Sequence, residues 1–122
     1  MAKVLVVEDD PWSQRLVCDV LEMRGHSVLV ANTVDEARAQ LANQPEVVLL
    51  DIHIPGGGGE LLLREIRATI ALRSLPVIAF TASAMTGDRE RFLEQGFTSY
   101  MSKPIDVSSF AETIEQALRG TR

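Results

Sequence analysis

The sequence contains little cysteine and no long apolar stretch. Cys18 is the only cysteine, so no disulfide can form within the chain, which favours a reducing compartment. The longest apolar runs fall far below the roughly 20 residues that a membrane-spanning helix needs. The first three residues lead directly into a short β-like run, so we expect no signal peptide and no membrane association. These absences predict a soluble, cytoplasmic protein.

Clusters of positive charge and phosphate-binding glycine motifs are also absent. The net charge is −5 and neither Lys nor Arg forms a run, so we expect no direct contact with nucleic acid. Of the 12 basic residues, only Lys3 and Lys103 are lysines. No G-x-G-x-x-G follows the first apolar run, which argues against a dinucleotide-binding enzyme. No G-K-[ST] follows the glycines at 56–59, which argues against a P-loop.

What the chain does contain is a regular alternation of short apolar runs and helical patterns. With 122 residues, of which 46% are hydrophobic, residues 1–122 are expected to form one domain with one core. The expected strands cover about residues 3–8, 27–31, 46–51, 76–80 and 98–102, and the expected helices about 11–24, 33–43, 60–72, 87–95 and 107–118. Parallel strands need crossover connections, so five such units predict an α/β fold with a doubly wound parallel sheet.

Periodicity also predicts which residues of the first and last helices face the core. These residues are Trp12, Leu16, Val20 and Leu21 in the first helix, and Val107, Phe110, Ile114, Ala117 and Leu118 in the last. Four residues of the first helix lie near the end of the first strand: Gln14, Arg15, Val17 and Cys18. They belong either to a surface that docks a partner or to an ordinary amphipathic helix.

Polar side chains follow four of the five expected strands at the point where each strand ends. Glu8 and Asp9 follow the first strand, Asp51 the third, Thr81 the fourth and Lys103 the fifth. The carboxyl ends of parallel strands meet at one edge of a sheet, where open α/β folds bind ligands. Carboxylates, a hydroxyl and an ammonium group are therefore predicted to share one cleft.

This group of side chains suits a divalent cation and a phosphoryl group. Three crowded carboxylates repel one another unless a cation lies among them, and oxygen ligands favour Mg²⁺. Asp51 is the candidate nucleophile for a phosphoryl group, and Lys103 and Thr81 are candidates for contacting the phosphate oxygens. Each residue alone has an ordinary alternative, as a solvated loop acid, a turn threonine or a surface lysine. The inference depends on their joint placement.

Four segments of the chain resemble the receiver domains of two-component response regulators. They are VLVVEDDP at 4–11, VVLLDIHIPGGGG at 47–59, VIAFTASAM at 77–85 and SYMSKPI at 99–105. The resemblance covers nearly all of the chain. It implies a flavodoxin-like sheet of order 2-1-3-4-5, with the site between the first and third strands. It also implies that Asp51 accepts the phosphoryl group, and that Glu8, Asp9, Asp51 and the backbone carbonyl of His53 hold Mg²⁺.

The same resemblance implies roles for further residues. Ser83 would tune how fast the phosphate is lost, and the Lys103-Pro104 bond would be cis. Thr81 would move toward the phosphate and Tyr100 would turn inward, which would switch the surface of the fourth helix, fifth strand and fifth helix. The alternative for Tyr100 is a half-buried strand aromatic whose hydroxyl lies in solvent.

The implied function is that of a single-domain response regulator. A histidine kinase or a histidine phosphotransfer protein would donate the phosphoryl group, and a downstream protein target would receive the signal. The protein would act as a monomer or as a phosphorylation-dependent dimer. It would catalyse its own phosphorylation and dephosphorylation without being a multiple-turnover enzyme. The alternatives are a receiver domain excised from a hybrid histidine kinase or a longer regulator, and a receiver that docks partners without being phosphorylated.

Overall fold

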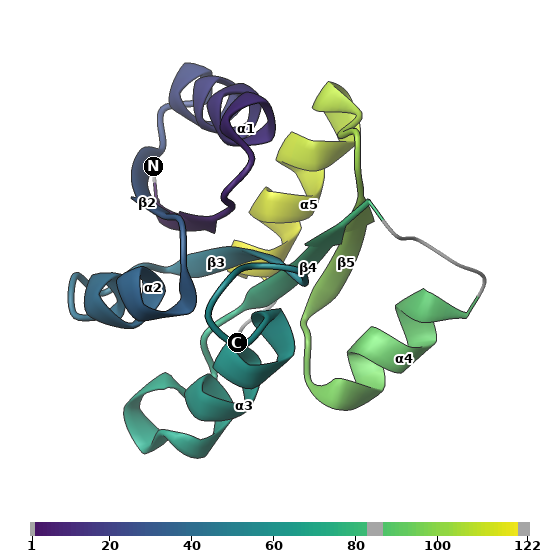
Figure 1. Cartoon of the computed structure of the whole chain (residues 1–122). Coiled ribbons are helices and arrows are strands. Elements are labelled where there is room, and N and C mark those ends of the chain that lie inside the picture. The colour runs from purple at the N-terminus through teal and green to yellow at the C-terminus, as the bar shows by residue number, and fades with distance from the viewer. Residues whose placement is uncertain (1, 83–86, 120–122) are drawn as a thin grey trace.

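A computed structural model of the chain has five parallel strands with helices on both faces of the sheet (Figure 1). The structure describes residues 2–82 and 87–119. The elements are β1 (Lys3–Val7), α1 (Pro11–Met23), β2 (Ser27–Ala31), α2 (Val34–Leu41), β3 (Val47–Asp51), α3 (Gly59–Ala68), the short 3₁₀ helix η1 (Ile70–Leu72), β4 (Val77–Thr81), α4 (Asp88–Gln95), β5 (Ser99–Ser102) and α5 (Val107–Arg119).

The strand order β2-β1-β3-β4-β5 confirms the predicted topology. All four neighbouring pairs are parallel. Strand β1 pairs with both β2 and β3, which is the point where the order of the strands in the sheet changes direction. In this order the carboxyl ends of β1 and β3 lie side by side, although about forty residues separate them in sequence. The site expected at this edge can therefore be assembled.

The two faces of the sheet bury alternate residues of the same strands. Val48 and Leu50 of β3 belong to a core beneath α2, α3 and α4, whereas Val47 and Leu49 belong to a core beneath α1 and α5. Both faces are covered, so the strand is apolar at every position rather than at every second one. The continuous apolar runs of the sequence thus indicate a sheet that is covered on both faces.

Side-chain caps fix the starts of the first two helices. Asp10 Oδ2 accepts a hydrogen bond from the backbone N–H of Ser13 at 2.8 Å, and Pro11 occupies the first turn of α1. Thr33 Oγ1 accepts from the N–H of Glu36 at 3.1 Å. These caps lie at the same edge of the sheet as the predicted site, so they also fix where the loops of that edge begin.

Three details of the helices differ from the sequence prediction. The third helix ends at Ala68 rather than near residue 72, because Thr69 takes an extended conformation and η1 follows. Trp12 is 66% exposed and Val107 is 53% exposed, so both predictions that they face the core are wrong. Each belongs to the first turn of its helix, beyond the edge of the core that Val17 and Phe110 enter.

Arg67 ties α3 to two other parts of the fold. Its guanidinium donates to the carbonyls of Gly96 at 3.0 Å, Leu75 at 2.7 Å and Arg73 at 3.1 Å. Burial lowers the pKa of this half-buried guanidinium. Because α4 ends at Gln95, the bond to Gly96 anchors the carboxyl end of α4 to α3.

Arg67→Met is expected to lower the free energy of unfolding by about 1.5 to 3 kcal/mol, since hydrogen bonds from a charged donor to three backbone carbonyls are lost. Urea denaturation followed by circular dichroism measures the change. Arg64→Met is the matched control, because Arg64 is exposed on the same helix and makes no hydrogen bond or ion pair within residues 2–82 and 87–119. Equal losses in both variants would contradict the anchoring role.

Candidate functional site

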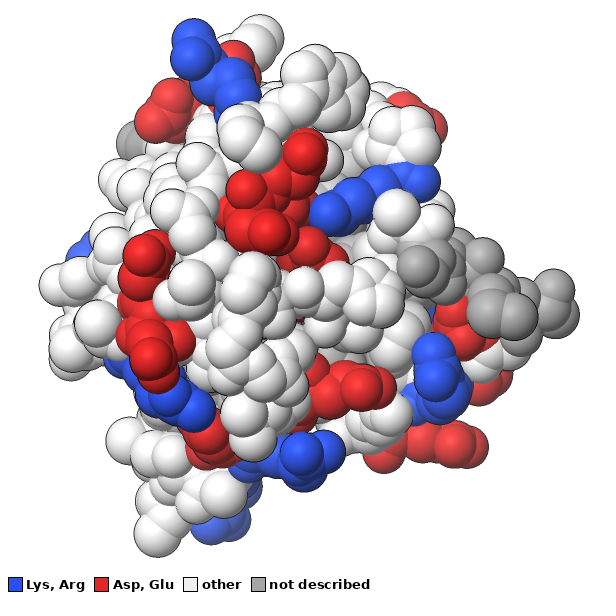
Figure 2. Space-filling model, viewed as in Figure 1, with Lys and Arg blue, Asp and Glu red and all other residues white. Residues whose placement is uncertain are grey.

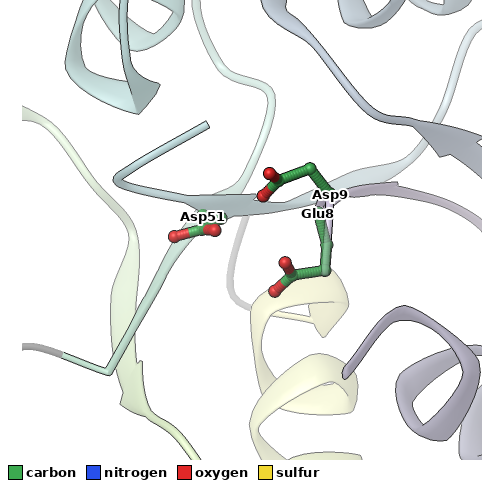
Figure 3. A group of neighbouring side chains, drawn as sticks. All are labelled: Glu8, Asp9 and Asp51. Atoms are coloured by element: carbon green, nitrogen blue, oxygen red, sulfur yellow. The ribbon is translucent and has the colours of Figure 1, made fainter. Parts of the chain in front are cut away.

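Three carboxylates meet at the carboxyl ends of β1 and β3. Glu8 and Asp9 directly follow β1, and Asp51 is the last residue of β3. One carboxylate oxygen from each residue lies within 4.8 Å of the others. Figure 3 shows the side chain of Asp51 facing those of Glu8 and Asp9 across the two strand tips. In Figure 2 the same face of the molecule carries a patch of acidic side chains near its centre, with basic side-chain atoms beside it.

The three carboxylates differ in their exposure to solvent. Glu8 is fully buried and Asp51 is 4% exposed, whereas Asp9 is exposed. Burial, together with the charge of Asp51, raises the pKa of Glu8, although the hydrogen bonds from Lys103 and from the N–H of Asp10 oppose this effect. The cluster thus consists of two buried acids and one exposed acid, and it reaches solvent at Asp9.

Lys103 supplies the positive charge at the site. Its Nζ lies 2.5 Å from Glu8 Oε1 and 3.3 Å from Asp51 Oδ2. Burial acts to lower the pKa of Lys103, but the hydrogen bonds and charges of Glu8 and Asp51 outweigh it and raise that pKa. The ammonium also lies 4.9 Å from the centre of the Phe80 ring. The Lys103-Pro104 bond is cis, as the resemblance implied.

The backbone around Asp51 holds its carboxylate in one orientation. Oδ1 accepts a hydrogen bond from the N–H of His53 at 3.0 Å, while Oδ2 faces Lys103. Gly59 packs against the same turn so closely that a Cβ there would lie 2.7 Å from the Asp51 carbonyl oxygen. The sequence alone does not distinguish Gly59 from the other three glycines at 56–59, because the need for glycine here comes from this close approach. Side chains at this position would displace the Asp51 turn.

The predicted site also included Thr81, Ser83 and His53. Thr81 is the buried last residue of β4, next to β3, and its carbonyl accepts from the N–H of Lys103 at 2.9 Å. Ser83 lies outside the described residues. The His53 side chain is exposed, and its imidazole does not join the acidic cluster within the described chain. The role of the His53 carbonyl stays a prediction.

Tyr100 is half-buried in β5 and its ring lies against α4. Its centroid is 5.3 Å from that of Phe92, in a tilted arrangement. The hydroxyl is buried without a hydrogen-bond partner in the described parts of the chain, and burial and the charge of Asp88 raise the pKa of Tyr100. The alternative, that this hydroxyl lies in solvent, is therefore wrong.

The residues at this site fit a divalent cation. Three carboxylates and one ammonium leave an excess of negative charge in a partly buried space, and every candidate ligand atom in the cluster is an oxygen. Hard cations such as Mg²⁺ prefer oxygen ligands and use one or two carboxylates with waters. Among the described residues, Glu8 Oε1 has an ion pair with Lys103 and no well-aligned hydrogen bond, so it can face such a cation.

Comparison with known protein families matches residues 4–115 to the response regulator receiver domain. The chain belongs to this family. As a receiver domain it is a module of two-component signalling, and its acidic pocket is consistent with Mg²⁺ and a phosphorylated aspartate. Domains of this kind are typically signalling modules rather than enzymes.

The receiver is similar to both curated and structurally characterised proteins. The polar-differentiation response regulator DivK of Brucella ovis is 38% identical over 117 residues, which cover 94% of each chain. The receiver domain of the Francisella response regulator 1452 superposes with a TM-score of 0.90 at 25% identity and full coverage of both chains. The receiver domain of sensor histidine kinase PA1611 from Pseudomonas aeruginosa PAO1, with a magnesium ion coordinated in its active site cleft, has a TM-score of 0.87 at 30% identity, covering 97% of this chain and 98% of that one.

No helix within residues 2–82 and 87–119 combines the length and the apolar character that crossing a bilayer requires. The cellular compartment stays a prediction from the sequence.

Proposed function

We propose that this receiver accepts a phosphoryl group on Asp51 with the help of Mg²⁺ and then signals to a partner protein. The observation that carries the proposal is the geometry of Asp51. Its carboxylate is fixed by the N–H of His53, lies 3.3 Å from Lys103 and shares a cluster with Glu8 and Asp9. Residues 1–122 would form a single phosphoacceptor domain.

The chain's own residues would perform most of the transfer. An oxygen of Asp51 forms a bond to phosphorus as the bond from phosphorus to the imidazole nitrogen of a donor phosphohistidine breaks. Positioning and charge neutralisation dominate this chemistry. Lys103 Nζ, already 3.3 Å from Asp51 Oδ2, is placed to contact an oxygen of the transferred group, and Thr81 at the neighbouring strand end can contact another. Mg²⁺ held by Glu8, Asp9, Asp51 and the His53 carbonyl would neutralise the charge that spreads over the phosphoryl oxygens.

A donor can reach the site from the side of α1. A shallow hollow of about 360 Å³ adjoins Lys103 and is lined by Asp10, Trp12, Ser13, Ala82, Lys103 and Pro104. The exposed indole of Trp12 borders this hollow. We infer that a histidine kinase or a histidine phosphotransfer protein approaches here, and that the donor's identity is set by contacts outside the acidic cluster.

Incubation with Mg²⁺ and acetyl phosphate tests the proposal. We expect an adduct of one phosphoryl group, measured by intact mass, that is stable in acid and labile in base, as an acyl phosphate is. Asp51→Asn should abolish it and EDTA should prevent it. Asp10→Asn is the control, since Asp10 is exposed and caps α1. An adduct that persists in Asp51→Asn, or no adduct in the wild-type protein, would reject this assignment.

Phosphorylation would change the surface of α4, β5 and α5 through Thr81 and Tyr100. Support for this comes from Tyr100, whose ring contacts Phe92 of α4 and whose buried hydroxyl has no hydrogen-bond partner among the described residues. Movement of the ring would break no hydrogen bond of this hydroxyl within the described residues, and Thr81 lies on β4, the strand that pairs with β5.

Tyr100→Ala is expected to leave the rate of phosphorylation by acetyl phosphate nearly unchanged and to remove the phosphorylation-dependent change of the α4-β5-α5 surface. The ring is distant in sequence from Asp51 but packs on α4, so its loss should uncouple that helix from the site. Hydrogen exchange of α4 and β5 amides, with and without acetyl phosphate, measures the coupling. Tyr100→Phe keeps the ring and should keep the change. Parallel loss of phosphorylation and of the exchange response in Tyr100→Ala would argue against a separate switch.

One alternative has a specific observation in its favour. The PA1611 domain, at 30% identity, is the receiver of a sensor histidine kinase, whereas DivK at 38% identity is named as a response regulator. The match to DivK extends over 94% of that protein, which supports a single-domain response regulator here. The full gene sequence distinguishes the two. Sedimentation of the phosphorylated and unphosphorylated protein distinguishes a monomer from a phosphorylation-dependent dimer.

A further inference from the structure

The side-chain amide of Gln14 spans two loops at the edge of the site. Its Nε2 donates to the carbonyl oxygen of Glu8 at 2.7 Å and to Asn32 Oδ1 at 2.7 Å. Both partners are acceptors, so the amide nitrogen must be the atom that faces them. Gln14 lies in the first turns of α1, and its own N–H donates to the carbonyl of Asp10 at 2.9 Å.

These bonds hold the turn that presents two of the three carboxylates. The ladder between β1 and β2 ends at Val7 and Ala31, and the ladder between β1 and β3 ends at Val7 and Leu50. Glu8 and Asp9 therefore lie beyond strand pairing, with one further backbone bond from Glu8 N to the Ala31 carbonyl at 3.0 Å. The carbonyl of Glu8 is held by Gln14 instead of by a neighbouring strand.

The partner of Gln14 is itself fixed to the next helix. The N–H of Asn32 donates to Glu36 Oε1 at 2.7 Å, and the N–H of Glu36 donates to Thr33 Oγ1 at 3.1 Å. A chain of hydrogen bonds thus runs from the first turn of α2 through Asn32 and Gln14 to the backbone of Glu8. The acidic turn is braced from both α1 and α2.

We propose that Gln14 is a positioning residue that holds the Glu8-Asp9 turn in the geometry that binds Mg²⁺. The inference rests on the proposed function, because it concerns the same metal site. The amide of Gln14, which bonds to the Glu8 carbonyl and to Asn32, would then serve the metal site rather than a docking surface. Gln14 would touch neither the phosphoryl group nor the cation and would act only through the backbone of Glu8.

Gln14→Met tests the proposal, because methionine keeps the length of the side chain and removes both donated hydrogen bonds. We expect the Mg²⁺ affinity to fall about tenfold, the low end of the range for residues that support metal ligands, since Gln14 bonds the backbone of Glu8 and not its carboxylate. Calorimetric titration of the whole chain with MgCl₂ measures the affinity, and the fluorescence of Trp12, which lies three residues from Asp9, gives a second readout. The rate of phosphorylation by acetyl phosphate should return to the wild-type value at saturating Mg²⁺.

Gln40→Met is a closely matched control. Gln40 Nε2 donates to the carbonyl of Val30 at 3.2 Å, and its Oε1 accepts from Asn43 Nδ2 at 2.8 Å, so the same kind of support is removed from a different helix. Asn32→Ala is a second variant that frees one end of Gln14. It should weaken Mg²⁺ binding less than Gln14→Met, and combining the two should add little, because both act on one chain of bonds.

Each outcome of these titrations decides the question. A specific loss of Mg²⁺ affinity in Gln14→Met, relieved at high Mg²⁺, supports the positioning role. Unchanged affinity, an equal loss in Gln40→Met, or a slow phosphorylation that high Mg²⁺ does not relieve would each overturn it. If the wild-type protein takes up no Mg²⁺, the proposed function fails as well. If the wild-type protein binds Mg²⁺ and Gln14→Met binds it equally well, only this inference fails.

Discussion

Lys103→Met is expected to lower the free energy of unfolding of the metal-free protein by about 3 to 5 kcal/mol, the range found when one partner of a buried ion pair is removed. The ammonium lies 2.5 Å from Glu8 and 3.3 Å from Asp51, and only 16% of the Lys103 side chain is exposed. Without it, a fully buried carboxylate faces a second one with no cation between them. Urea denaturation in EDTA measures the loss.

Removing the second charge should reverse most of this effect. In Glu8→Gln/Lys103→Met the buried carboxylate is replaced by a neutral amide of the same shape, so we expect the double variant to be more stable than Lys103→Met alone. The non-additive part of the double-mutant cycle measures the pair directly. If the two single losses simply add, Lys103 does not act through Glu8.

Mg²⁺ should partly replace the missing ammonium. In the wild-type protein Lys103 already neutralises part of the acidic cluster, so a cation that enters gains less from the carboxylates. We therefore expect Lys103→Met to bind Mg²⁺ more tightly than the wild-type protein and to gain more stability from it, while its phosphorylation by acetyl phosphate becomes much slower. Tighter Mg²⁺ binding together with slower phosphorylation in one variant would separate two roles of the Lys103 charge: competing with the cation for the carboxylates and contacting the phosphoryl group.

The sheet and the acidic cluster could both be predicted from the sequence, for one physical reason. Strands covered on both faces are apolar at every position, so the short apolar run from Val47 to Leu50 predicts a buried strand. The first polar residue after such a run is then placed at the sheet edge by the strand itself. Glu8, Asp51 and Thr81 could be predicted in this way because their positions depend on strand ends and strand order alone.

The features that the sequence did not predict depend on contacts between distant segments. Trp12 has the right helical spacing for the core, but spacing fixes the side of a helix and not how far along that helix the core extends. Gly59 is needed because α3 lies so close to the carbonyl oxygen of Asp51 that a Cβ at this position would clash with it. The side chain of Gln14 is held by a hydrogen bond to Asn32, which is 18 residues away in the chain. Such contacts leave no periodic pattern in the sequence.

Asp9→Asn is expected to remove most of the stabilisation that Mg²⁺ gives. With Mg²⁺ at 100 times the wild-type dissociation constant, binding should raise the free energy of unfolding by about 2.7 kcal/mol. Loss of one carboxylate ligand should weaken binding by about 100-fold, the upper range for changes around a metal ligand, which would leave about 0.4 kcal/mol of that gain. Thermal or urea unfolding, repeated with MgCl₂ and with EDTA, measures the difference.

The metal-free protein should respond in the opposite direction. Asp9 is exposed, and its carboxylate makes no hydrogen bond or ion pair within the described part of the chain, yet it lies within 4.8 Å of the oxygens of Glu8 and Asp51. Its charge therefore opposes folding when no cation is bound, so Asp9→Asn in EDTA should be as stable as the wild-type protein or more stable. Asp10→Asn is the matched control, because asparagine also caps a helix and the cluster keeps all three carboxylates. It should retain the full response to Mg²⁺. A stabilisation by Mg²⁺ that survives in Asp9→Asn, or disappears in Asp10→Asn, would mean that the cation binds elsewhere.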